Sequence, residues 1–109
     1  MAREFNCGTL DLLAGRFKAL AEPMRLRIMN ALRKREKTVT ELVDELGAGQ
    51  ANISKHLSLL HRHRMVTRRK EGLNVYYRIA DNTTFELCEI MCGSLEIEFE
   101  EKQQALKRS

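Results

Sequence analysis

Residues 38–62 read TVTELVDELGAGQANISKHLSLLHR, and this stretch decides the fold. It opens with a capping box, because the hydroxyl of Thr38 and the carboxylate of Glu41, three residues on, satisfy the free N–H groups of a helix start. A short helix from about residue 40 to 46 follows. Two glycines within the next three residues then predict a tight turn. A longer helix is predicted over 50–62, so the stretch predicts two helices joined by a turn.

The longer helix has two distinct faces. Ile53, Leu57 and Leu60 recur at i, i+4 and i+7, which predicts one buried face. The opposite face carries Gln50, Ala51, Lys55, Ser58 and Arg62, with Asn52 and Ser54 at its sides. The arrangement predicts a helix-turn-helix whose second helix enters the DNA major groove. The alternative for these polar residues is an ordinary solvated helix face.

The polar side chains have the chemistry for reading bases. The amides of Gln50 and Asn52 can pair with adenine, and Lys55 can reach guanine or phosphate. Ser54 is a flexible donor and acceptor. His56 lies beside the buried stripe, where it either contacts DNA or fills a groove within the protein.

A basic hairpin is predicted after this helix. The β-rich runs 65–70 and 75–79 surround a short turn that contains glycine and asparagine. Arg68, Arg69 and Lys70 lie near its tip, and Asn74 lies in the turn. We expect these side chains to contact phosphates or to enter a minor groove.

The rest of the chain predicts one domain over 1–109, with an ordered core from 9 to 104 and flexible ends. Thr9 is expected to cap a first helix to Leu20, and a second helix is expected over 23–34. Leu26 is expected in the buried stripe of that second helix, and 33–37 is expected as a solvated turn. A last helix is predicted to about 104, with a wide arc of apolar residues: Leu87, Ile90, Met91, Leu95, Ile97 and Phe99.

Charge is unevenly distributed along the 109 residues. Residues 1–80 carry 16 Lys/Arg and 8 Asp/Glu, whereas residues 81–109 carry 3 and 7. A basic body favours a polyanionic partner, although a solvated surface is the alternative. The chain has no apolar run that would span a bilayer, and residues 1–7 lack the apolar core of a signal peptide, so we expect a cytoplasmic protein.

An enzyme is not expected, because the sequence contains no nucleophile elbow, P-loop or dinucleotide fingerprint. A winged helix that serves only as a protein-interaction module remains a competing interpretation.

Three segments together resemble the ArsR/SmtB family of metal- and metalloid-responsive repressors. They are ALAEPMRLRI at 19–28, QANISKHLSLL at 50–60, and 68–78 with its RRKEG and VYYR runs. The resemblance implies a mainly α winged helix-turn-helix with a small β-hairpin wing. It also implies a homodimer formed through the first and last helices, which occupies an inverted-repeat DNA operator and leaves it when an inducer binds.

The resemblance does not supply a sensor site. One family site is a cysteine pair in the third helix, and residues 41–46 contain no thiol. A second family site needs Asp and His at the start of the last helix and His and Glu further along. Asp81 fits the first position, but Thr83, Ser94 and Ile97 stand at the others.

The remaining candidate is a set of three cysteines. Cys88 and Cys92 have i, i+4 spacing, which places both thiols on one helical face. Cys7, from either protomer, is a candidate third ligand. Three thiolates without histidine favour As(III) or Sb(III) as the inducer, and no cofactor is required. The alternatives are redox or persulfide sensing by the same thiols, or a silent packing role, because the spacing continues into Leu95 and Phe99.

The histidines offer a weaker metal site. His61 and His63 lie at the end of the helix over 50–62 with no cysteine nearby, and Arg62 and Arg64 surround them. We expect them to be solvated or to face DNA.

Overall fold

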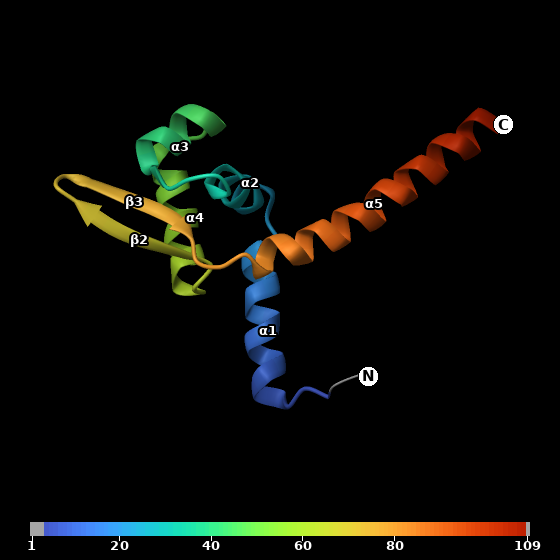
Figure 1. Ribbon diagram of the computed structural model, residues 1–109, viewed down its shortest axis with the longest axis horizontal. Helices are drawn as coiled ribbons and strands as arrows, with labels where there is room; N and C mark the ends of the chain where they lie inside the picture. The colour runs from blue at the N-terminus through green and yellow to red at the C-terminus, as the bar shows by residue number, and fades with distance from the viewer. Residues whose placement is uncertain (1–3, 109) are drawn as a thin grey trace.

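The computed structural model describes residues 4–108 of the chain (Figure 1). The described residues form five helices and three strands in this order: α1 (Cys7–Leu20), α2 (Pro23–Leu32), β1 (Lys37–Thr38), α3 (Val39–Leu46), α4 (Gln50–Arg62), β2 (Val66–Glu71), β3 (Asn74–Ile79) and α5 (Thr83–Arg108). In Figure 1, α2, α3, α4 and the sheet gather into one body, from which α1 and α5 extend as two separate arms. The winged helix-turn-helix predicted from the sequence is confirmed.

The core of the body lies between α2, α3 and α4. Ile53, Leu57 and Leu60 of α4 are each 0% exposed, as their spacing predicted. They pack with Ile28, Met29 and Leu32 of α2, Leu42 of α3 and Val66 of β2. Leu26 was expected in this stripe, but it is 41% exposed, because the face of α2 that packs inward is centred on Ile28 and Met29.

The helix α3 is capped at both ends. The Thr38 hydroxyl accepts the Glu41 backbone N–H at 3.2 Å, and the Glu41 carboxylate accepts the Thr38 N–H at 3.2 Å. The predicted capping box is therefore confirmed. Gly47 ends α3 with φ +67°, a left-handed conformation that glycine adopts without steric cost. The two caps fix where α3 begins and ends, and Gly47 starts the turn that leads into α4.

The sheet contains a strand that the sequence did not reveal. Its order is β1-β3-β2, all antiparallel, with Lys37 opposite Tyr77 and Arg69 opposite Tyr76. We expected 33–37 to be a solvated turn. That expectation is wrong for Lys37, which is only 9% exposed and donates to Glu45 at 2.5 Å. Pairing with β3 buries it, and a two-residue strand is too short to show a period in the sequence.

Helix boundaries differ from expectation at three places. Asn6 caps α1 by accepting the Thr9 N–H at 2.8 Å, so the helix starts at Cys7 and Thr9 is not its cap. The second helix ends at Leu32, two residues before the expected end. The last helix runs to Arg108, beyond the expected end at 104. Of the two expected flexible ends, residues 1–3 and 109 lie outside the described residues.

The two arms leave much apolar surface uncovered. Leu10 and Phe17 of α1 are 46% and 47% exposed, and among residues 83–107 of α5 only Thr84 and Phe85, in its first turn, are buried. The predicted apolar arc of α5 is exposed along most of its length. None of the helices in residues 4–108 has the length and hydropathy that crossing a bilayer would require.

We predict that Leu57→Ala lowers the free energy of unfolding by about 2–5 kcal/mol, because it leaves a cavity in the core. Leu73→Ala is the matched control, since Leu73 is fully exposed in the turn between β2 and β3. The control should change stability by less than about 0.5 kcal/mol. Urea unfolding at one fixed chain concentration measures both variants, and equal losses would show that α4 is not anchored by this stripe.

Candidate nucleic-acid interface and thiol site

The outward face of α4 is polar and carries no negative charge. Gln50, Ala51, Asn52, Lys55, Ser58 and Arg62 are exposed, and Ser54 is partly exposed. The helix contains no Asp or Glu. Its N-cap is Gly49, which provides no side-chain hydrogen bond to the first turn. The backbone N–H groups at this end therefore remain available to an anion.

His56 belongs to the inner side of α4. Its side chain is only 12% exposed, with Nε2 3.8 Å from the Glu22 carboxylate and Nδ1 3.4 Å from Nη1 of Arg25. Arg25 also donates to the backbone oxygens of Ala19 and Lys18, at 2.5 and 3.2 Å. Of the two roles expected for His56, this geometry favours filling a groove within the protein. The residue connects α4 to the corner between α1 and α2.

The wing formed by β2 and β3 separates its basic residues onto two faces. Side chains alternate along a strand, so Arg68 and Lys70 share a face with the buried residues Val66 and Tyr77. That is the side on which the core and α4 lie. Arg69 and Asn74 belong to the opposite face. We expected all four residues to contact DNA together, because they lie close to one another in the chain. The strand register shows that they belong to two different faces of the wing.

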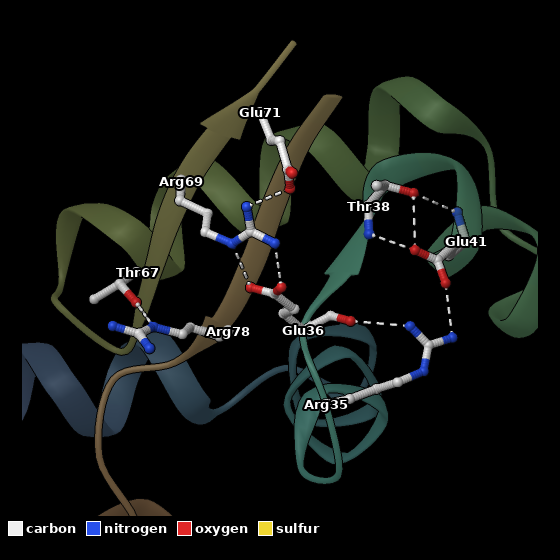
Figure 2. Close-up of polar contacts among 8 residues, drawn as sticks. All are labelled: Arg35, Glu36, Thr38, Glu41, Thr67, Arg69, Glu71 and Arg78. Atoms are coloured by element: carbon white, nitrogen blue, oxygen red, sulfur yellow. Dashed lines mark hydrogen bonds and ion pairs between the residues drawn. The ribbon is translucent and has the colours of Figure 1, made fainter. Parts of the chain in front are cut away.

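Arg69 is held by carboxylates on its face of the wing, as Figure 2 shows. Its Nε donates to Glu36 at 2.9 Å, its Nη2 donates to the other Glu36 oxygen, and its Nη1 donates to Glu71 at 2.6 Å. Its guanidinium carbon also lies 4.6 Å from the centroid of the Tyr76 ring. The hydrogen bonds from Arg69 lower the pKa of Glu36 below the ordinary 4.5. The pair is therefore intact above pH 4.5 and is lost as the pH falls through that lowered pKa.

Cys88 and Cys92 border a groove between α2 and α5. The groove has a volume of about 350 Å³, and its walls are Leu26, Met29, Asn30, Arg33, Thr84, Phe85, Cys88, Glu89 and Cys92. Arg33 connects its two sides, because it donates to Glu89 at 2.6 Å and stacks 5.0 Å from the Phe85 ring centroid. Cys88 is half-buried and Cys92 is exposed.

The surroundings of Cys88 in this groove disfavour its thiolate form. Burial raises the pKa of the Cys88 thiol above its ordinary value, and the charge of the neighbouring Cys92 thiolate raises it further. Cys88 therefore stays a neutral thiol at neutral pH. Cys7 is exposed at the start of α1. Within residues 4–108 of one chain, no three His, Cys, Asp or Glu side chains come close enough together to hold a metal ion.

Comparison with known proteins identifies the family. The family described as "Bacterial regulatory protein, arsR family" matches residues 22–68, which include α2, α3, α4 and the start of the wing. The chain is 33% identical over 84 residues to a probable mercury resistance operon repressor of Streptomyces lividans, and the match covers 77% of this chain and 67% of that protein. This chain belongs to the ArsR family.

Two further comparisons show the extent of the likeness. A transcriptional repressor SmtB homolog of Synechocystis is 41% identical over 71 residues, which are 65% of this chain and 54% of that relative. The match thus spans about half the length of that relative. A homodimeric winged helix-turn-helix DNA-binding domain of Mycobacterium bovis, a possible ArsR-family regulator, superimposes with a TM-score of 0.78 at 29% identity. That superposition covers 93% of this chain and 95% of the solved one.

Sequence reasoning missed three residues of this ArsR-family protein that position the site. Arg25 and Glu22 hold His56, and Glu36 holds Arg69. Arg25 lay within a quoted family motif, but its partners come from other helices and share no spacing with it. Glu36 lay within a charged run that is typical of a solvated turn. Only the register of β1 against β3 brings it to the wing.

Proposed function

We propose that this chain is a DNA-binding transcriptional repressor of the ArsR type. The observation that carries the proposal is the outward face of α4, which is polar, exposed and free of acidic residues. It is opposite a stripe that is completely buried, so the face has a fixed orientation. In this proposal α4 enters the major groove, where its amides and its lysine can pair with base edges. The regulators found among the relatives agree with this function, and we assign no catalytic role.

The proposed contacts fall into two groups. Gln50, Asn52, Ser54 and Lys55 lie in the first two turns of α4, the part of a recognition helix that reaches base edges. Contacts from the wing and from the end of α4 would go to phosphates and set the position of the protein. Arg68, Lys70 and Arg62 are exposed cations placed for that role. Ala51, Ser58 and Asn74 would border the contact, and His56 supports α4 from inside.

We propose that two copies pair through α1 and α5. The large apolar side chains exposed on these two helices include Phe17, Ile90, Met91, Leu95 and Phe99. Uncovered apolar surface of this extent marks an association site. The Mycobacterium bovis domain with the same fold is homodimeric, which supports a homodimer here. A two-fold axis would present two α4 helices to successive turns of an inverted repeat.

We propose that Cys88 and Cys92 form the inducer site, with As(III) or Sb(III) as the ligand. Each As–O bond of arsenous acid is replaced by an As–S bond, and the hydroxyl leaves as water with the thiol proton. The reaction can therefore proceed from neutral thiols such as Cys88. Cys7 of either protomer would supply the third sulfur. Binding in the groove between α2 and α5 would shift α5 and favour the state that cannot hold DNA.

Redox or persulfide sensing by the same two thiols is the second candidate. The i, i+4 pair and the exposure of Cys92 favour it. The raised pKa of Cys88 counts against it, because attack on an oxidant or a persulfide needs the thiolate. The relative named as a mercury resistance operon repressor supports an ion as the inducer.

We predict that Asn52→Ala weakens binding to an inverted-repeat fragment from upstream of the gene by about 5- to 100-fold, through loss of a base contact. Binding to a scrambled duplex should change less than about twofold. Gln103→Ala, which removes an exposed amide from α5, is the matched control. Fluorescence anisotropy with a salt series measures both. If Asn52→Ala reduced binding to both duplexes equally, α4 would not be the reading helix.

We predict that Leu95→Glu converts the protein from dimer to monomer in sedimentation velocity, since it places a charge on the apolar face of α5. Gln103→Glu adds the same charge at a polar position and should remain dimeric. A dimeric Leu95→Glu protein, or a wild-type protein that sediments as a monomer at micromolar concentration, would refute pairing through this helix.

We predict that the double variant Cys88→Ser, Cys92→Ser stays on its operator at an arsenite concentration that releases at least 90% of the wild type. Cys7→Ser tests whether Cys7 is the third ligand. If arsenite releases that variant fully, the site consists of Cys88 and Cys92 alone. The assay is run in reductant, with a parallel arm containing persulfide. Release of the double variant by arsenite would refute the thiol site. Release of the wild type by persulfide but not by arsenite would assign the thiols to redox or persulfide sensing instead.

A further inference from the structure

We propose that Arg69 is a positioning residue that fixes the wing to the body of the protein and makes no phosphate contact of its own. We call its paired contact with Glu36 the strap. The proposal rests on the DNA-binding function proposed above, and it separates Arg69 from its basic neighbours. Arg68, Arg69 and Lys70 form a continuous basic run in the sequence, so all three look alike as candidates for the DNA backbone. The structure gives Arg69 different partners and a different face.

The first argument is the path of the Arg69 side chain. Arg69 lies on β2, which is one edge of the sheet, and Glu36 directly precedes β1 at the other edge. The guanidinium stacks on Tyr76 of the central strand and donates hydrogen bonds to both carboxylate oxygens of Glu36 (Figure 2). One side chain thus spans all three strands. Glu36 follows α2, so the strap connects the wing to the loop after a core helix.

The second argument is charge. Arg69 faces two carboxylates, Glu36 and Glu71, so its positive charge is already balanced within the protein. A cation contributes to DNA affinity mainly by replacing counterions on phosphates. A guanidinium that is paired twice has no free charge to offer for that exchange. Within the described part of the chain, no carboxylate lies in ion-pair distance of Arg68 or Lys70, which remain available.

The third argument is the need for a strap. β2 is an edge strand whose only partner in the sheet is β3, and the wing beyond Tyr76, which includes Lys70, has two strands because the two-residue β1 pairs with Tyr76 and Tyr77 alone. A two-stranded hairpin is only marginally stable on its own. If the wing moved relative to the body of the protein, its cations would lose the fixed position from which they reach phosphates. A bidentate Arg–carboxylate pair combined with ring stacking gives the geometric restraint that a single surface ion pair lacks.

The test compares three variants of the full-length chain: Arg69→Gln, Lys70→Gln and Glu36→Gln. Operator affinity is measured over a potassium chloride series. Lys70→Gln removes a phosphate contact, so the slope of log Kd against log salt should fall by about 0.9. Arg69→Gln should weaken binding about two- to tenfold and leave the slope unchanged.

Glu36→Gln provides the sharpest contrast. It removes a negative charge near the wing, so simple attraction to DNA predicts tighter binding. The strap predicts that it weakens binding about as much as Arg69→Gln does. The double variant Glu36→Gln, Arg69→Gln should be no weaker than either single variant. A slope for Arg69→Gln that falls as much as that of Lys70→Gln, or a Glu36→Gln protein that binds as tightly as the wild type, overturns the proposal.

A measurement without DNA keeps the strap testable if the operator proves to be a different sequence. Amide hydrogen exchange over 67–71 should be faster in Arg69→Gln and in Glu36→Gln than in the wild type, and unchanged in Lys70→Gln. Exchange in α4 should stay the same in all variants, which excludes general unfolding. Unchanged exchange over 67–71 in both strap variants would refute the strap, whatever the DNA result.

Discussion

The burial of one face of α4 is the constraint on which the rest of this structure depends. Ile53, Leu57 and Leu60 are completely buried against α2, α3 and β2, and a rigid helix that buries one face has its rotation about its axis fixed. The polar residues between them are therefore held outward. The capping box at Thr38 fixes the start of α3, and the left-handed Gly47 ends it and begins the turn into α4.

Burial also fixes the faces of the wing, but with the two-residue repeat of a β-strand. Burial of Val66 and Tyr77 decides which side of the sheet faces the core, and the pleat then assigns every other residue of β2 and β3 to a face. Neighbouring cations in the sequence thus have different tasks. Those on the core side remain open to solvent, whereas Arg69 on the other side is occupied by carboxylates of this chain.

The two arms and the thiol groove belong to one region of the molecule. The first turn of α5 packs on the body through Thr84 and Phe85, and the groove with Cys88 and Cys92 lies next to that anchor. Beyond it, α5 exposes the apolar residues that we assign to pairing. A ligand that moves the start of α5 would therefore change how two copies are oriented, and so how far apart their α4 helices lie. His56 and Arg25 provide a second physical connection, from α1 to α4.

The sequence by itself determined the helix-turn-helix, the bounds of α4, the capping box and the presence of a hairpin. Each of these depends on residues close together in the chain, such as Thr38 with Glu41 or Ile53 with Leu57, so local periodicity and capping chemistry reveal them. Only the tertiary structure decided the strand at Lys37, the exposure of Leu26, the inward position of His56 and the pairing of Arg69 with Glu36. These features depend on which residues from distant segments meet, and that depends on how whole elements pack. No local pattern in the sequence contains that information.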